Sequence, residues 1–194
     1  MTTATPDTDE LLARTADGDK AARDQLLTRH RARLRKMVAY HLDRRIHARV
    51  DPSDVVQEVL AEASRKLPDY LRQRPLPFYP WLRQMAETYL VAMRRRHVDA
   101  EKRSVRREEP GVLALPDESA AELAARLVTS ATSPSQRLQR EELRQQVHRA
   151  LAQLGPRDRQ VLVLRHLEQL SVADTAAVLR ISEGALKTRH VRAL

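Results

Sequence analysis

The segment from 171 to 190, SVADTAAVLRISEGALKTRH, contains two apolar series that are out of phase with each other. The first series is Val172, Ala176 and Leu179, and the second begins at Leu186. Each series has the spacing of one helix face, and Ser171 and Ser182 stand where helix N-caps are expected. A phase break between two capped helices predicts a sharp turn. We therefore expect a helix-turn-helix, in which Ala176 is small enough to permit a close helix crossing.

The second helix of such a unit enters the major groove of DNA. The side chains predicted to face outward from it are those of Glu183, Ala185, Lys187, Thr188, Arg189 and Arg192. Lysine and arginine can bind phosphates or guanine edges, and threonine offers a hydroxyl and a methyl group. The spacing is also compatible with an ordinary helical hairpin in an α-helical core, because short motifs recur by chance.

The overall charge favours a polyanionic partner. Lys and Arg number 35 against 26 Asp and Glu, which gives a formal net charge of +9. Such a balance is typical of nucleic-acid-binding proteins, although a basic protein without that role is the alternative. The absence of Cys excludes disulfides, iron–sulfur clusters and thiolate zinc sites, and agrees with a reducing cytosol.

Targeting signals are not evident in the sequence. The dense apolar stretches, such as VLVL at 161–164, are far shorter than the roughly 20 residues of a membrane-spanning helix. The first ten residues are polar and acidic, which is unlike a secretory signal. We expect a cytoplasmic protein without membrane insertion.

Helix formers dominate the chain, so the predicted fold class is all-α. A short helix is expected over 8–16, followed by a turn at Gly18 and a longer helix. The next helix has a strong start signal at Asp51 and Pro52, and we expect it to end before Pro68. Four prolines between 68 and 80 predict a segment that is largely loop.

The C-terminal half is predicted to form a separate helical unit. The stretch 107–133 mixes Pro, Gly, Ser and Ala with weak periodicity, and reads as a linker with a short helix at 118–128. From 134 onward the apolar periodicity is again helical. We therefore expect two small helical domains, 8–106 and 134–194, joined by a flexible linker.

Three motifs resemble a known family. The sequence LAQLGPRDRQVLVLRHLEQLSVADTAAVLRISEGALKTRHVRAL resembles region 4 of sigma-70 family sigma factors, and also the DNA-binding domain of LuxR-type regulators. In the N-terminal half, DPSDVVQEVLAEASRKL resembles region 2.2 of the extracytoplasmic function (ECF) sigma factors, and FYPWLRQMAETYLVAMRRRH resembles their regions 2.3 and 2.4. The motifs occur in the order of the ECF group, with a linker in place of region 3. The resemblance covers about residues 10–106 and 134–194.

The resemblance implies an RNA polymerase sigma factor that binds the core polymerase, recognises promoter DNA and promotes transcription initiation. Residues 8–106 would bind polymerase and the minus-ten element, and residues 134–194 would bind the minus-thirty-five element. Members of the family act in the cytoplasm, and many are held by an anti-sigma factor, which makes such a protein a candidate partner. The alternative is a LuxR-type regulator that is not a polymerase subunit, which leaves 51–96 unexplained.

Polymerase binding is assigned by the resemblance to Asp54, Gln57 and Glu58. These positions share one helix face, because residues three and four apart are neighbours on a helix. The two carboxylates could also suggest a metal site or an acid/base pair. No His lies within the same helix, and an acidic stripe is most often solvated.

Minus-ten binding is assigned to aromatic and basic side chains of the next segment. They are Tyr79, Tyr89, Arg94, Arg95, Arg96, Lys102 and Arg103. Melted DNA exposes bases that can stack on aromatic rings, and the cations can follow the phosphate backbone. A solvated cationic helix end is the alternative, and we expect the neighbouring Phe78 and Trp81 to be core residues.

Enzymatic activity is not expected. The seven His are scattered, and the sequence has no HExxH, glycine-rich phosphate loop or nucleophile elbow, so we expect no cofactor and no metal. Two positions depart from the family pattern: Arg180 replaces a small or short polar turn residue, and His190 replaces an apolar one. Relatives also continue the last helix beyond the position of Leu194, so we expect either weaker minus-thirty-five binding or a cropped sequence.

Overall fold

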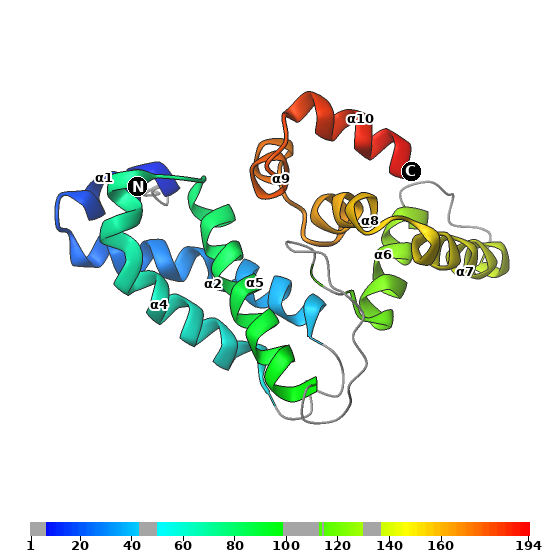
Figure 1. Ribbon diagram of the computed structural model, residues 1–194, viewed down its shortest axis with the longest axis horizontal. Helices are drawn as coiled ribbons and strands as arrows, with labels where there is room; N and C mark the ends of the chain where they lie inside the picture. Colours follow the sequence, from blue (N-terminus) through cyan, green and yellow to red (C-terminus); the bar gives the residue numbers. More distant parts are fainter. Residues whose placement is uncertain (1–6, 43–49, 99–112, 114, 130–136) are drawn as a thin grey trace, which may run out of the picture.

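Helices make up all the regular secondary structure of the described residues. The computed structural model describes 7–42, 50–98, 113, 115–129 and 137–194. The helices are α1 (Thr8–Ala16), α2 (Lys20–His41), α4 (Pro52–Gln73), α5 (Phe78–Val98), α6 (Asp117–Thr129), α7 (Arg137–Gln153), α8 (Pro156–Leu162), the π-helix η1 (Val163–Leu167), α9 (Val172–Leu179) and α10 (Glu183–Ala193) (Figure 1). The prediction of an all-α fold is confirmed. Within these ranges, no helix is long and apolar enough to cross a membrane.

Local signals set most of the helix starts. The side chain of Asp19 accepts a hydrogen bond from the backbone N–H of Ala22 (3.0 Å) and so caps α2. Asp51 caps α4 in the same way, and Pro52 occupies its first turn. These bonds satisfy backbone donors that have no partner within the helix, which explains why short polar residues precede the helices.

The end of α4 differs from the sequence-based expectation. The helix continues through Pro68 to Gln73, and the loop before α5 is only 74–77. A proline inside a helix costs about 3 kcal/mol. Here Leu67 and Tyr70 continue the apolar face of α4 and are 2% and 4% exposed. Burying two such side chains contributes about 1.5–3 kcal/mol each, which offsets the cost of the proline.

Among the described residues, α1, α2, α4 and α5 form the N-terminal half. These helices pack around an apolar cluster that includes Leu26 of α2, Leu67 of α4, and Phe78 and Trp81 of α5. Phe78 and Trp81 are 3% and 9% exposed, so their prediction as core residues is confirmed. In Figure 1 this half occupies the left of the molecule.

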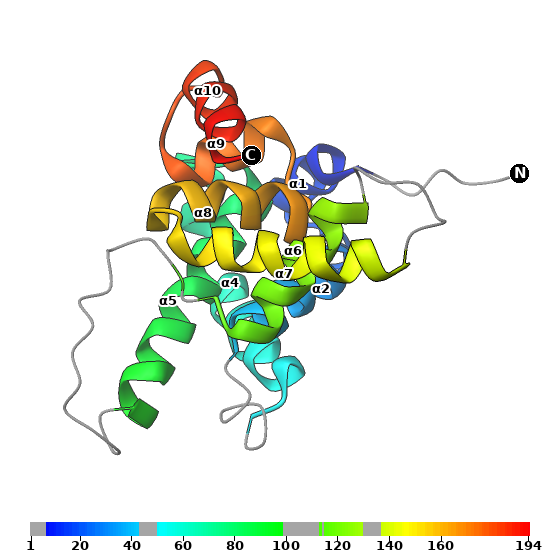
Figure 2. The same cartoon turned by 90° about the vertical axis from the view of Figure 1, so that its right-hand side faces the viewer.

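The C-terminal half begins earlier than the periodicity alone indicates. Helix α6 lies within the predicted linker, where a short helix was expected, and it packs against α7 and η1 (Figure 2). Its apolar face, including Leu123 and Ala124, joins Leu151 and Leu162 in one buried cluster. Residues 117–129 are therefore packed as part of the C-terminal half.

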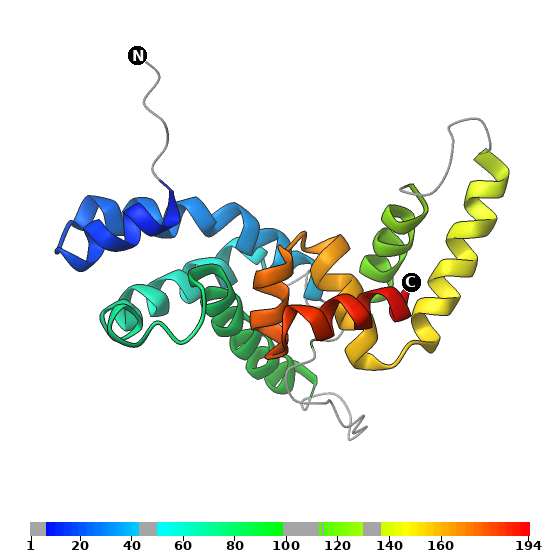
Figure 3. The same cartoon turned by 90° about the horizontal axis from the view of Figure 1, so that it is seen from above.

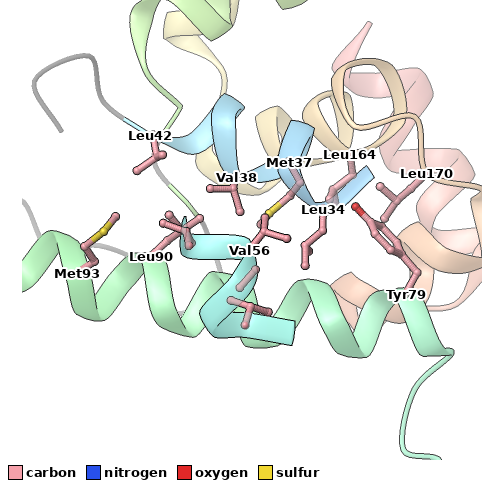
Figure 4. Close-up of a cluster of buried hydrophobic side chains, with 13 residues drawn as sticks. Leu34, Met37, Val38, Leu42, Val56, Tyr79, Leu90, Met93, Leu164 and Leu170 are labelled. Carbon is pink, nitrogen blue, oxygen red and sulfur yellow. The ribbon is translucent and has the colours of Figure 1, made fainter. Parts of the chain in front are cut away.

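The two halves share a hydrophobic cluster. Met37 of α2 and Tyr79 of α5 lie in the same buried cluster as Leu164 of η1 and Leu170, and Figure 4 shows these side chains side by side. Helix α9 also packs against α5, between the halves (Figure 3). The halves are thus in direct contact, and they position α5 and α10 on the two sides of one junction.

Candidate nucleic-acid and polymerase interfaces

The turn between α9 and α10 has the geometry predicted from the phase break. Arg180 adopts a left-handed conformation (φ 54°), and the N–H groups of Arg180 and Ile181 donate to the carbonyls of Ala177 (3.3 Å) and Ala176 (3.1 Å). This pair of bonds is a Schellman motif, the usual way to end a helix before a sharp turn. Arg180 therefore occupies a position that favours glycine.

Both helices of the unit are capped as predicted. The backbone N–H of Asp174 donates to Ser171 Oγ (2.9 Å), and that of Ala185 donates to Ser182 Oγ (3.2 Å). Ala176 and Leu186 pack against Val161 of α8 in a small buried cluster. The helix-turn-helix thus has its own core, with α8 as its support.

Most of the predicted DNA-binding side chains of α10 face solvent. They are Glu183, Ala185, Lys187, Thr188 and Arg192, whereas Arg189 is half-buried. Asp158 of α8 accepts hydrogen bonds from Arg192 (2.8 and 3.0 Å) and lies 3.6 Å from Arg189 Nε. Since ion pairs of exposed side chains contribute little, the exposed Arg192 can exchange Asp158 for a phosphate.

A histidine pair lies at the back of α10, and sequence reasoning did not find it. His190 Nε2 is 2.8 Å from His166 Nε2 of η1, and the rings stack with centroids 5.0 Å apart. Burial is the main cause that lowers the pKa of both residues. His190 therefore replaces the expected apolar residue as a half-buried, mainly neutral ring that packs against η1.

The acidic start of α4 is a second exposed surface. Asp54, Gln57 and Glu58 are exposed, whereas Val55 and Val56 beside them are buried in the junction cluster. The buried valines fix the rotation of α4, and the three polar side chains consequently share its outer face. This surface is available to a protein partner.

The residues assigned to the minus-ten element differ in how far they are exposed. Arg95 is exposed, and Tyr89 and Arg94 are half-buried on α5. Tyr79 is only 4% exposed, with the guanidinium of Arg33 3.8 Å above its ring. The side chain of Arg96 is not described, and Lys102 and Arg103 lie outside the described residues.

Comparisons with known proteins span both halves. A family profile described as "Sigma-70, region 4" matches residues 144–194. The RNA polymerase sigma-H factor of Pseudomonas aeruginosa is 29% identical, over 95% of this chain and 88% of its own length. The ECF RNA polymerase sigma-E factor of Escherichia coli K12 is 29% identical, over 96% of this chain and 90% of its own length. The solved structure of CnrH in complex with the cytosolic domain of CnrY covers 96% of this chain and 92% of the CnrH chain, with 26% identity and a TM-score of 0.51.

The chain is thus similar to RNA polymerase sigma factors, the ECF sigma-E factor among them, along most of its length, and residues 144–194 match sigma-70 region 4. Because the similarity to sigma factors includes the N-terminal half, it accounts for the part that a LuxR-type regulator leaves unexplained. Sigma factors are transcription initiation subunits and not enzymes, which agrees with the expectation from the sequence.

A groove runs through the junction between the two halves. It has a volume of about 850 Å³ and is lined by both halves. Arg95 and Val91 of α5 form one side, and Arg180 and Arg189 of the helix-turn-helix form the other. One residue predicted to bind the minus-ten element and one predicted to bind the minus-thirty-five element thus face the same groove.

A buried ion network joins the two halves beside this groove. Arg83 of α5 donates two hydrogen bonds to Glu168, from Nε to Oε2 (2.8 Å) and from Nη2 to Oε1 (2.9 Å). His41, at the end of α2, lies 2.9 Å from Glu168 Oε1. Burial by itself raises the pKa of Glu168, but the charge and hydrogen bonds of Arg83, assisted by His41, lower it to about 2. No sequence signal pointed to this network, because its members are far apart in the chain.

Proposed function

We propose that this chain directs core RNA polymerase to promoters by dividing the task among three surfaces. The start of α4 binds the polymerase, α5 and the residues that follow it bind the minus-ten element, and α10 binds the minus-thirty-five element. The exposed outer face of α10, in a capped helix-turn-helix of a chain similar to sigma factors along its length, carries this proposal. On this basis, 8–106 and 134–194 remain the proposed functional domains.

The polymerase-binding surface is the most direct point to test. In the variant Asp54→Lys with Glu58→Lys, two exposed acidic side chains become basic while the buried valines beside them are unchanged. We expect this variant to lose co-elution with core polymerase on a sizing column, because the charge of the contact face is reversed. Its binding to a minus-thirty-five DNA fragment should stay unchanged, since α10 is untouched.

The matched control reverses Asp9 and Glu10 to Lys. These two residues are also exposed and lie in the first turn of a helix, and the change in net charge is the same. The control should co-elute with polymerase like the unmodified protein. Normal co-elution and transcription by the α4 variant would contradict the assignment of this surface, and failure of the unmodified protein to bind polymerase would contradict the function itself.

The site of action follows from the partners. Core polymerase and promoter DNA lie in the cytoplasm of bacteria, so we propose that the protein acts there. CnrH, which is similar in fold, has been solved in complex with the cytosolic domain of another protein, CnrY. We propose that a regulatory protein of the anti-sigma type also binds this chain, and that pull-down from cells expressing the tagged chain would recover it alongside polymerase subunits.

A further inference from the structure

A carboxylate of α8 lies against the helix that is proposed to bind the minus-thirty-five element. Asp158 is in the first turn of α8, which packs against α10, and its side chain is 22% exposed. Arg192 Nη2 donates to both of its carboxylate oxygens, at 2.8 and 3.0 Å, and Arg189 Nε lies 3.6 Å from Oδ1. One acidic group is thus shared by two of the arginines predicted to bind DNA.

The cations of α10 consequently differ in their surroundings. Arg189 and Arg192 are three positions apart and lie on the same side of the helix, next to Asp158. Lys187 is exposed and makes no ion pair within the described part of the chain. The helix therefore presents one unpaired cation and two arginines whose charge is partly neutralised.

The pairing with Asp158 leaves part of each guanidinium group for DNA. Arginine has five N–H donors in a rigid fork, and Asp158 contacts Arg192 through Nη2 and Arg189 through Nε alone. The remaining donors can reach guanine O6 and N7, which accept from arginine in the major groove. A carboxylate that holds one edge of a guanidinium also limits its rotation, so the other edge is better oriented for a base.

A backbone phosphate competes with Asp158, whereas a base edge does not. An Arg192 that leaves Asp158 for a phosphate also leaves an unpaired carboxylate beside that phosphate. Two like charges brought together in this way repel each other. A guanine edge has no net charge, so an arginine can bind it while its pair with Asp158 stays intact. The cost therefore applies mainly to backbone binding.

We propose that Asp158 is a selectivity residue, which positions Arg189 and Arg192 for base edges and disfavours their binding to backbone phosphates. This role rests on the proposed function of α10. Phosphate contacts supply essentially all of the non-specific affinity for DNA, and base contacts supply the specificity. Removal of the carboxylate should therefore strengthen binding to any sequence and reduce the preference for the correct one.

Asp158→Asn tests the proposal, because it removes the charge and keeps the shape of the side chain. The unmodified full chain, alone and in parallel bound to core polymerase, is used to select duplexes from a pool of random sequence. Fluorescence anisotropy at several salt concentrations then gives the affinity of each variant for a selected duplex and for a shuffled duplex of the same composition.

The variant should bind the shuffled duplex about tenfold more tightly, with a salt dependence that is steeper by about one charge. Its affinity for the selected duplex should change much less, so the ratio of the two affinities should fall about tenfold. A folding defect cannot produce this result, because it would weaken the binding of both duplexes.

Two further variants separate the role of Asp158 from overall charge. Glu141→Gln makes the same change in net charge on α7, where Glu141 pairs with Arg144 of its own helix (3.4 Å), and should leave both affinities unchanged. Asp158→Glu keeps the charge next to α10 and should keep the preference for the selected duplex. An equal gain in shuffled-duplex affinity in Glu141→Gln and Asp158→Asn would assign the effect to overall charge and overturn the proposal.

The remaining outcomes distinguish this proposal from the function on which it rests. If the unmodified protein selects a sequence and Asp158→Asn keeps the same ratio of affinities, Asp158 is not a selectivity residue, and the proposed function stands. Weaker binding of both duplexes by Asp158→Asn would likewise overturn the proposal, because Asp158 would then only support the fold. Failure of the unmodified protein to select any sequence, alone or with polymerase, would contradict the proposed function of α10 together with the role of Asp158.

Discussion

The helix-turn-helix and the junction between the halves are built in opposite ways. The helix-turn-helix is stabilised by contacts between residues close in sequence. Ser171 caps α9 by accepting from the N–H of Asp174, and Ser182 caps α10 by accepting from the N–H of Ala185. The turn is closed by backbone hydrogen bonds between residues three and five positions apart. The junction is held by Arg83 and Glu168, which are 85 positions apart. The first unit therefore presents an exposed face that depends little on its surroundings, whereas the second exists only when both halves meet.

This difference separates a permanent surface from a conditional one. The outer face of α10 is exposed although the halves are in contact, so its availability does not require opening. Tyr79 lies in the buried cluster that both halves share, so its burial depends in part on their contact. The contrast predicts that changes at the junction alter stability and exposure, and that changes on α10 alter DNA affinity alone.

Acid should weaken the junction by the largest amount. The pKa of Glu168 is lowered from 4.5 to about 2 in the folded protein, so its stabilising effect is complete above pH 4.5 and is lost as pH falls toward 2. At about 1.4 kcal/mol per pH unit, this difference corresponds to about 3 kcal/mol of unfolding free energy. Chemical unfolding followed by the fluorescence of Trp81, at several pH values, measures it.

The Glu168→Gln variant is the reference for this titration. All other carboxylates titrate in both proteins, so the difference between the two curves isolates Glu168. The difference in unfolding free energy should be largest and constant above pH 4.5, and should shrink as the pH falls from 4.5 toward 2. If the two curves of unfolding free energy against pH are parallel over the whole range, the ionisation of Glu168 does not stabilise the fold. The junction would then not differ from the helix-turn-helix in the way described above.

DNA binding by α10 should respond with a smaller change and no loss of stability. Lys187→Ala removes an exposed cation, and we expect affinity for minus-thirty-five DNA to fall about tenfold, or about 1.4 kcal/mol. Fluorescence anisotropy with a labelled duplex at several salt concentrations measures it. If Lys187 binds a phosphate, the loss is similar for all sequences and the salt dependence falls by about one charge.

Lys66→Ala is the control for Lys187→Ala. Lys66 is exposed on α4, where it pairs with Glu62 (3.0 Å), and its removal changes the net charge equally. Its DNA affinity should match that of the unmodified protein. Equal losses in the two variants would mean that overall charge, and not the face of α10, determines binding.

The same contrast explains what the sequence could predict. Caps and phase breaks act over three to five residues, so the start of α4 at Asp51 and the turn at Arg180 were predictable. The continuation of α4 through Pro68 was not, because packing of Leu67 and Tyr70 overrides the local preference. The acidic face of α4 was visible as a pattern, but its role still rests on family resemblance.

Contacts between distant residues left no trace in the sequence pattern. Tyr79 and Tyr89 look alike as aromatic residues of one segment, yet one is buried under Arg33 and the other is half-buried. The pairing of His166 with His190 and of Arg83 with Glu168 depends on how two halves meet. A single sequence contains the residues of such contacts but does not show which of them pair.

The smallest effect is expected at the turn, where the local rules can be tested most finely. Arg180 is exposed and adopts φ 54°, a conformation that costs a side-chain-bearing residue about 1–2 kcal/mol and glycine almost nothing. Glycine also increases the entropy of the unfolded chain, which opposes the gain by about 0.5–1 kcal/mol. Arg180→Gly should therefore stabilise the protein by about 0.5 kcal/mol and raise Tm by about 1–2 °C.

Arg180→Ala removes the same side chain without relieving the strain and should give no increase in Tm. A gain in the alanine variant equal to that in the glycine variant would assign the effect to the charge of Arg180 in the groove, and the turn would then not be the self-contained element that distinguishes the helix-turn-helix from the junction.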